Sequence, residues 1–399
     1  MNIPVIPTAL SGAEHESIAR AVPEFVALRQ DLHRHPELAF HETRTSALIA
    51  ERLAEWGYEV TTGLAETGVV GTLRRGSGRR RLGIRADIDA LPVTEATGLP
   101  YASTTPGVMH ACGHDGHTAI LLAAARHLAE AKGLDGTLHL IFQPAEEIGG
   151  GARRMLSDGL LDRFPLDAIF GLHNWPGEPA GRFGFVEGTA MAAVDHVSAT
   201  IRGQGGHGAA PHQTVDPVVA AAQVITALQT VVSRNVNPLE AAVVSVGSIH
   251  GGHASNVIPG TVDLKLTLRS YAPDVRDLLE ARVVSLIRSV AEGLGASAEV
   301  VHRRGFPSLV NHAAEIALIR GVAKTSFGPN AIIEGFQPRT ASEDFAFFLQ
   351  RLPGAFVFVG AGPGAPLHSP HYRFNDDIIA PAAALWVALA RRFLNGDVT

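Results

Sequence analysis

The stretch TAILLAAARHLAEAKGLDGTLHLIFQP, residues 118–144, contributes most to the expected fold. Its first half, residues 118–131, is apolar on nearly every side, which is typical of a helix buried in a protein interior. After a glycine-containing turn, residues 137–144 form a short apolar run that predicts a strand. A buried helix that leads into a buried strand is the repeating unit of α/β proteins.

The same alternation extends in both directions along the chain. Residues 46–56 have helical periodicity and end at Gly57, and strands are expected at 69–73, 81–87 and 167–174. Near the other end, the pattern predicts a strand at 355–362 and helices at 312–326, 343–352 and about 376–394. We therefore expect an α/β domain with a largely parallel sheet flanked by helices.

A different pattern interrupts this domain. The expected elements, in order, are strand 194–203, helix 216–233, strands 241–249 and 261–270, helix 274–292 and strand 297–303. This is the β-α-β-β-α-β order of ferredoxin-like domains. Since 399 residues are too many for one typical domain, we expect an α/β domain of residues 1–186 and 301–399, with a small α+β domain of residues 187–300 inserted.

Composition narrows the class of protein. Hydrophobic residues make up 46% and charged residues 18% of the chain, as in globular proteins, and the formal net charge is −6. The strongest basic run, RRGSGRRR at 74–81, is interpreted as a solvated hairpin loop and not as a nucleic-acid patch.

The chain also lacks the sequence features of secreted and membrane proteins. A single cysteine excludes an intrachain disulfide framework, and residues 1–17 have no signal-peptide pattern. No window approaches the ~18 uninterrupted apolar residues of a membrane span. A soluble, cytoplasmic protein that binds neither nucleic acid nor membranes is expected.

Polar clusters lie where the expected strands end, the edge at which α/β sheets gather their functional groups. They are RADIDALP (85–92), PAEE (144–147), GLHN (171–174) and GPGAPLHSPHY (362–372), and MHACGHDGH (109–117) leads into the buried helix. We expect these loops to bring together seven side chains: Asp87, Cys112, His114, Glu146, Glu147, His173 and His368.

This set of donors suits a pair of divalent cations. Thiolate, imidazole and carboxylate together favour Zn, Mn, Co or Ni over Mg or Ca. Two such ions can lower the pKa of a water molecule and polarise a carbonyl group. In the adjacent pair Glu146 and Glu147, one carboxylate can bind metal while the other transfers a proton.

Two other classes of protein remain as alternatives. Cys112 could be a thiolate nucleophile activated by His110 or His114, but Glu147, His173 and His368 would then have no role. An inactive metal-binding or interaction protein would be expected to lack Glu146 or one of the ligands, and all of them are present.

These motifs, together with LRQDLHRHPELAFHE, GGHGAAPH, NVIP, SEDF and LHSPHYRFND, cover nearly the whole chain. On them the chain resembles the metal-dependent amidohydrolases that include hippurate hydrolases, bacterial N-acyl-amino-acid amidohydrolases and plant auxin-conjugate hydrolases. These belong to the wider clan of aminoacylase- and carboxypeptidase-G-like dinuclear metallopeptidases. The resemblance implies a catalytic α/β domain with an inserted lid that often mediates dimerisation, and hence a homodimer or higher homo-oligomer.

The resemblance also implies roles for single residues. Two divalent ions would be bound by Cys112, His114, Glu147, His173 and His368, with Glu146 as general base and acid. Where the wider clan has a histidine ligand, this chain has Arg85, which cannot bind metal, so Cys112 supplies a donor and Asp87 orients a ligand.

In the lid, the resemblance implies that His207 stabilises the oxyanion, often in the partner subunit's active site. Asn256 and Arg269 would hold the substrate carboxylate. Ser342 is expected to cap a helix, with Glu343 and Asp344 at most supporting the site. No role is assigned to His250 or His253, and other histidines are interpreted as structural or solvated: His33, His35 and His41.

The expected function is therefore hydrolysis of the amide bond of N-acyl amino acids, which releases a carboxylic acid and a free amino acid. A dipeptidase or carboxypeptidase with the same mechanism is the alternative. A substrate with a free α-amine would call for an additional acidic anchor, and the sequence offers no clear candidate.

Overall fold

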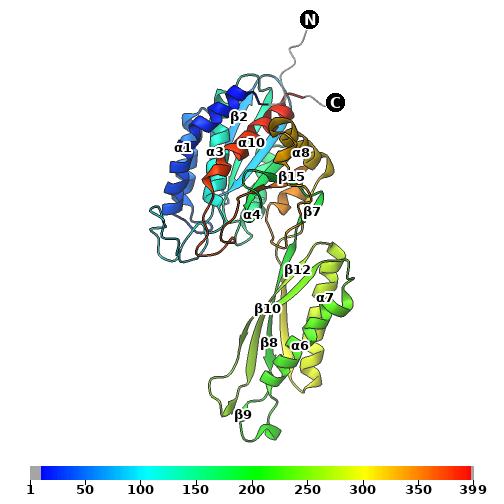
Figure 1. Ribbon diagram of the computed structural model, residues 1–399. Helices are drawn as coiled ribbons and strands as arrows, with labels where there is room; N and C mark the ends of the chain where they lie inside the picture. Colours follow the sequence, from blue (N-terminus) through cyan, green and yellow to red (C-terminus); the bar gives the residue numbers. More distant parts are fainter. Residues whose placement is uncertain (1–9, 397–399) are drawn as a thin grey trace. The chain divides into compact units, whose positions relative to one another are not determined.

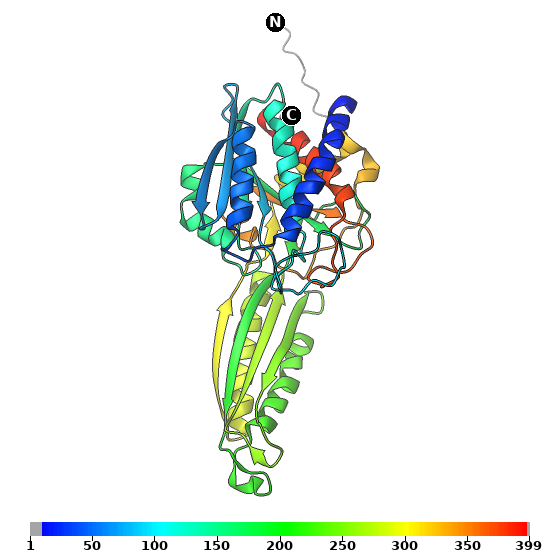
Figure 2. The same ribbon diagram turned by 90° about the vertical axis from the view of Figure 1, so that its left-hand side faces the viewer.

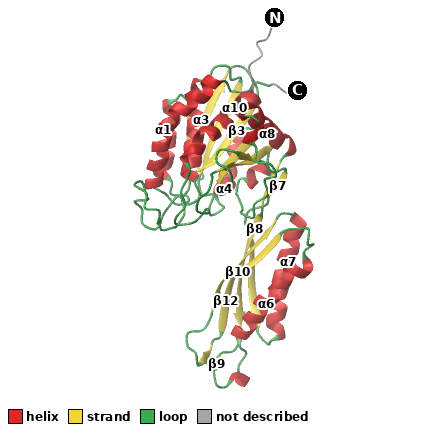
Figure 3. Ribbon diagram, viewed as in Figure 1, coloured by secondary structure: helices red, strands yellow, loops and turns green. Residues whose placement is uncertain are grey.

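The computed structural model describes residues 10–396, and the chain divides into two compact units. Unit 1 comprises residues 1–188, 310–337 and 344–399, and unit 2 comprises residues 189–309 and 338–343. The chain passes between the units near two short strands, β7 (Gly188–Met191) and β14 (Leu309–Asn311). Figures 1 and 3 show the elements of each unit. Residues 1–9, where no signal peptide is expected, lie outside the described residues.

Unit 1 is built around a seven-stranded sheet. Its strands, in spatial order, are β1 (Glu59–Leu64), β2 (Gly68–Arg75), β4 (Gly136–Gln143), β3 (Arg81–Asp87), β5 (Ala168–Trp175), β15 (Gly354–Gly360) and β6 (Phe183–Gly184). The four strands β4, β3, β5 and β15 run parallel to one another, and the remaining pairings, β1 with β2, β2 with β4 and β15 with β6, are antiparallel. The carboxyl ends of the four parallel strands therefore meet at one edge of the sheet.

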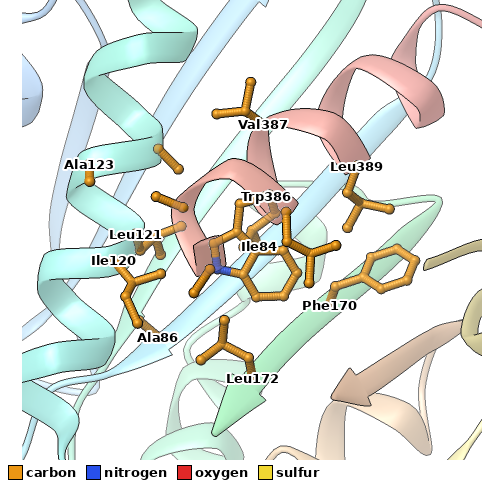
Figure 4. Close-up of a cluster of buried hydrophobic side chains, with 14 of the residues drawn as sticks. Ile84, Ala86, Ile120, Leu121, Ala123, Phe170, Leu172, Trp386, Val387 and Leu389 are labelled. Atoms are coloured by element: carbon orange, nitrogen blue, oxygen red, sulfur yellow. The ribbon is translucent and has the colours of Figure 1, made fainter. Parts of the chain in front are cut away.

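Helices bury the parallel strands. The helices of unit 1 are α1 (Gly12–Arg34), α2 (Thr43–Glu55), α3 (His114–Glu130), α4 (Gly151–Ser157), α5 (Leu160–Arg163), α8 (Ala313–Phe327), α9 (Ala346–Leu349) and α10 (Ile379–Leu394). Figure 4 shows Ile120 and Leu121 of α3 and Trp386 of α10 around Ile84 of β3 and Phe170 of β5. Because both faces of these strands are covered, they read as continuous apolar runs in the sequence.

Unit 2 is a four-stranded antiparallel sheet with two helices. The spatial order is β10 (Ala242–His250), β12 (Thr261–Ser270), β8 (Ala193–Arg202) and β13 (Ser297–Arg304), and Figure 2 shows these strands side by side. Helices α6 (Pro217–Asn235) and α7 (Pro273–Gly293) pack on β12 and β8 and on each other. Residues of β12 alternate between exposed and buried, since only one face of the sheet carries helices.

The predicted fold class, α/β with a ferredoxin-like insertion, is confirmed. Several local predictions were wrong. Residues 74–81 form no hairpin, because β4 lies between β2 and β3 and pairs with both. The helix expected at 343–352 is limited to Ala346–Leu349. The expected domain boundary at residue 301 falls inside β13, whereas unit 2 continues to Leu309.

Among residues 10–396, no helix is long and apolar enough to cross a membrane.

Candidate metal centre

Unit 1 brings the predicted ligands together where its parallel strands end. His173 lies in β5, and Glu146 and Glu147 follow β4. His368 belongs to the loop after β15, and Cys112 and His114 stand at the start of α3. Three overlapping groups have ligand atoms within 4.8 Å of one another: Cys112, His114 and His173; Cys112, Glu147 and His368; and His114, Glu146 and Glu147.

Cys112 is common to the first two groups. Its Sγ lies 3.3 Å from His173 Nε2, and both side chains are buried. His368 Nε2 lies 3.4 Å from Glu147 Oε1. The centre thus contains two sets of donors that share one sulfur atom.

The start of α3 determines where Cys112 and His114 lie. Gly113 has φ +96°, and a Cβ there would lie 2.4 Å from Asn174 Oδ1 and 2.7 Å from the Tyr372 hydroxyl oxygen. Only glycine fits this turn without strain. The helix begins at His114, four residues earlier than predicted, so His114 is held in a helical turn.

Two buried ligand atoms, His114 Nε2 and Glu147 Oε1, have no hydrogen-bond partner among the described residues, although they lie 3.9 Å apart. Buried polar atoms without a hydrogen bond are costly unless another group binds them. Their donor chemistry, with a thiol and further imidazoles beside them, fits borderline transition metals. The residues present therefore fit a divalent metal.

The electrostatics of the centre also favour a cation. Burial lowers the pKa of His114, but the carboxylates of Asp87 and Asp89 outweigh it and raise the pKa to about 10. Burial raises the pKa of the Cys112 thiol well above its usual range, and the charges of Glu147 and Glu146 raise it further. Without a nearby cation these groups oppose the thiolate that a cysteine nucleophile requires.

The ring nitrogens of the ligands are oriented by their partners. His173 Nδ1 donates to the carbonyl oxygen of Asn174 at 2.7 Å, which leaves Nε2 to face Cys112. His114 Nδ1 lies 3.0 Å from the carbonyl oxygen of Asp89 and 3.2 Å from its Oδ1. Such contacts fix the ring so that Nε2 can bind metal.

Sequence reasoning missed Asp89. Besides contacting His114, its Oδ2 accepts a hydrogen bond from the Glu147 backbone N–H at 3.0 Å. One carboxylate therefore positions two of the predicted ligands. The available signal was the spacing in RADIDALP, since residues two apart in an extended segment point to the same side.

Asp87 contacts His117 more closely than it contacts a predicted ligand. Its Oδ1 lies 2.6 Å from His117 Nδ1, and its Oδ2 accepts from Arg85 Nη1 at 2.8 Å. Its Oδ2 lies 3.7 Å from His114 Nε2. His117 Nε2 is in turn 2.7 Å from Asn174 Oδ1.

Glu146 is 5% exposed and lies against Asp344, whose backbone N–H donates to Glu146 Oε1 at 3.3 Å. The Asp344 carboxylate accepts from Gln143 Nε2 at 2.8 Å and from Arg85 Nη2 at 3.1 Å. Arg85, which replaces the histidine of the wider clan, thus connects Asp87 with Asp344. The sequence identified Arg85 as a non-ligand but did not predict this connection.

In unit 2, His207 and Asn256 lie side by side and exposed. His207 belongs to β9 (Gly206–His207), which pairs with β11 (Val257–Ile258), and Asn256 directly precedes β11. His207 Nδ1 accepts from the Ala209 backbone N–H at 3.0 Å, so the proton of the neutral ring is on Nε2.

Arg269 lies at the other end of the unit. It pairs with Val194 in β8, whereas β9 follows Arg202 at the far end of that strand (Figure 1). Arg202 lies eight positions after Val194 in β8, a distance of about 26 Å along the strand. Half-buried Arg269 donates to Ser342 Oγ at 2.6 Å. The predicted cap at Ser342 was wrong, because this hydroxyl binds Arg269 and α9 starts later.

Comparison with known proteins identifies a family model and several relatives that match this chain. The family model “Peptidase family M20/M25/M40” matches residues 83–392. The chain is 41% identical to “Hippurate hydrolase” of Campylobacter jejuni over 371 residues, which is 93% of this chain and 97% of that protein. It is also 41% identical to “N-acetyl-L-cysteine deacetylase” of Bacillus subtilis, covering 94% of this chain and 89% of that protein.

A similar solved structure is the Bacillus subtilis YXEP protein, described as a dinuclear metal binding peptidase from the M20 family. The two share 34% identity with a TM-score of 0.80, over 96% of this chain and 99% of that one.

Proposed function

Because this chain belongs to peptidase family M20/M25/M40, we propose that its centre uses divalent metal ions to hydrolyse the amide bond of N-acyl amino acids, in agreement with the names of two relatives, hippurate hydrolase and N-acetyl-L-cysteine deacetylase. The chain is a hydrolase that releases a carboxylic acid and a free amino acid. The observation that carries the assignment is the presence of two buried ligand atoms without a hydrogen-bond partner, His114 Nε2 and Glu147 Oε1, beside a buried thiol and a second carboxylate.

Five residues would hold two divalent ions. His114 and His173 form one donor set and Glu147 and His368 the other, and both sets include Cys112, which we propose as the shared ligand. Zn, Mn, Co or Ni suits these donors. When bound, the ions would polarise the amide carbonyl and lower the pKa of water.

Glu146 transfers the proton between the attacking water and the departing nitrogen. Its carboxylate lies beside the ligands without belonging to the two sets that share Cys112. It takes a proton from the attacking water and delivers it to the nitrogen of the departing amino acid. The Asp344 N–H, which donates to Oε1, keeps the carboxylate in place for both transfers.

The lid residues would bind the substrate. The Nε2–H of His207 is a donor suited to the oxyanion, and Arg269 and Asn256 would hold the carboxylate. Arg269 and Asn256 lie at opposite ends of a strand pair about 26 Å long, so one small substrate cannot touch both in a single lid. We therefore propose that two copies of the chain form a dimer through the lid and share each active site.

A cytoplasmic location is also part of the proposal. A thiol that binds metal must stay reduced, and the cytoplasm keeps thiols reduced.

The substitution E146Q tests the assignment. It keeps the shape of the side chain and removes the base, so kcat on N-benzoylglycine should fall about 10²- to 10⁴-fold with two metal ions still bound. Retained turnover would exclude Glu146 as the base. The wild-type chain should be compared on N-benzoyl, N-acetyl and indole-acetyl amino acids and on unblocked dipeptides, because preferential cleavage of dipeptides would favour the peptidase alternative.

A further inference from the structure

Glu42 is a buried carboxyl group outside the metal centre. It lies at the start of α2 and is 0% exposed. No cationic side chain of residues 10–396 forms an ion pair with it. A buried carboxyl group without a cation is costly, so its contacts indicate what it does.

Both of its oxygens accept hydrogen bonds. Oε2 accepts from the Thr67 hydroxyl at 2.6 Å, and Oε1 accepts from the Ala145 backbone N–H at 2.9 Å. Thr67 lies in the turn between β1 and β2, and Ala145 immediately precedes Glu146. Glu42 therefore joins the start of α2 to the loop that carries Glu146 and Glu147.

Ala145 needs this support because its backbone is strained. Its φ is +52°, the left-handed region that residues with a Cβ rarely adopt. Its carbonyl oxygen accepts from Gly150 N–H at 3.2 Å and from Gly151 N–H at 3.1 Å. A Cβ at Gly151 would lie 1.6 Å from the Pro144 carbonyl oxygen, so the loop closes tightly. Glu42 holds the remaining polar group of Ala145, its N–H.

We propose that Glu42 is a positioning residue for Glu146 and Glu147: by accepting the Ala145 N–H it holds the strained turn from which both carboxylates project. This inference rests on the roles of Glu146 and Glu147 in the proposed function. Burial raises the pKa of Glu42 to about 7, and the negative charge of Asp89 contributes to this increase. A carboxyl group at this buried position therefore costs free energy, and its hydrogen bond to the loop explains why it is present.

Two conservative substitutions at Glu42 separate the effect of side-chain length from the effect of charge. E42Q keeps an oxygen at the same distance from Ala145, whereas E42D keeps the charge and withdraws the oxygen by one methylene. At saturating metal we expect E42D to lower kcat on N-benzoylglycine at least about tenfold with KM little changed, because small displacements of catalytic groups are expensive. E42Q should stay within about threefold of wild type.

Glu37 offers a matched control. Its carboxylate accepts from the backbone N–H groups of Arg44 at 2.9 Å and Thr45 at 2.8 Å, also at the start of α2, but it does not contact the loop at Ala145. E37D should keep the wild-type kcat. The proposal is overturned if E37D loses as much as E42D, if E42Q loses as much as E42D, or if E42D keeps the wild-type kcat.

A second readout does not depend on turnover. In the Co²⁺-loaded proteins, the visible absorption spectrum reports the coordination that includes Glu147. E42D should change this spectrum and weaken Co²⁺ binding, while E42Q and E37D should match wild type; identical spectra for E42D and wild type would refute the positioning role. If E42D does not fold, E42M, which fills the same length without an acceptor, takes its place with the same expectation.

The two claims fail in different ways. Absence of wild-type turnover on every N-acyl amino acid, with the expected Co²⁺ spectra, contradicts the proposed function and leaves the positioning role standing. Normal wild-type turnover with an unaffected E42D variant contradicts the positioning role alone.

Discussion

Replacing Asp89 by asparagine tests whether one carboxylate holds two metal ligands. In the structure Asp89 Oδ2 accepts from the Glu147 N–H at 3.0 Å, and Oδ1 lies 3.2 Å from His114 Nδ1. An asparagine must turn its NH₂ group toward one of these two donors. D89N therefore loses one contact and places two donors face to face.

The magnitude follows from these contacts. A hydrogen bond to a charged group contributes about 1.5–3 kcal/mol, and loss of an outer contact to a metal ligand typically weakens metal binding about 10- to 100-fold. His114 Nδ1 keeps the Asp89 carbonyl oxygen at 3.0 Å, so part of its orientation survives. We expect a loss near tenfold if the amide turns toward His114 and nearer 100-fold if it turns toward Glu147.

The assay is competition between the protein and a chelator for Zn²⁺ or Mn²⁺. D162N is a matched control, because it makes the same chemical change at an exposed aspartate of α5. D162N should bind metal as wild type does. If D89N also binds metal with the wild-type affinity, Asp89 does not position the two ligands.

Three further predictions concern single residues. C112S should reduce the metal-to-protein ratio after dialysis, measured by elemental analysis, and an unchanged ratio of two would contradict ligation by the thiolate. R269A should raise KM about tenfold or more for N-acyl amino acids with a free carboxylate, as expected for a lost charged contact, and an equal loss on the carboxamide analogues would refute the carboxylate role. In metal-free protein, burial raises the pKa of Glu42 from 4.5 to about 7, so the folded chain holds this proton more tightly than the unfolded chain does. Wild type should therefore lose up to about 3 kcal/mol of stability relative to E42Q as the pH rises through this range, and parallel pH profiles of denaturant unfolding would contradict this.

The sequence predicted elements well where burial alone imposes a pattern. The alternation of β12 and the apolar strands β3 and β5 could be identified without knowledge of their neighbours, because each pattern reflects which faces are covered. The start of α3 was misplaced by four residues, since His114 and His117 do not look like buried helix positions until their polar partners are known.

The pairing of the strands could be predicted less well from the sequence. Residues 74–81 connect β2 and β3 in the chain, which suggested a hairpin, but β4 separates the two strands in the sheet. Nothing local in the sequence records that a later strand is inserted between two earlier ones. The short α9 shows the same limit, because the Ser342 hydroxyl binds Arg269, 73 residues earlier in the chain.

The predicted ligands are brought together because they share a simple rule, placement at strand ends. The residues that orient them follow no such rule. Asp89 and Glu42 accept hydrogen bonds from backbone N–H groups of the loop after β4, and any residue type except proline could supply those N–H groups. Residues that bind such N–H groups can be identified only when the backbone conformation of the loop is known.

The two-metal centre is tested most directly by titrating metal-free protein with Zn²⁺ or Mn²⁺ while hydrolysis of N-benzoylglycine is followed. We expect no activity without metal and a rise in activity that ends at two ions per chain. Full activity in the chelated protein, or a maximum reached at one ion per chain, would contradict a two-metal hydrolase.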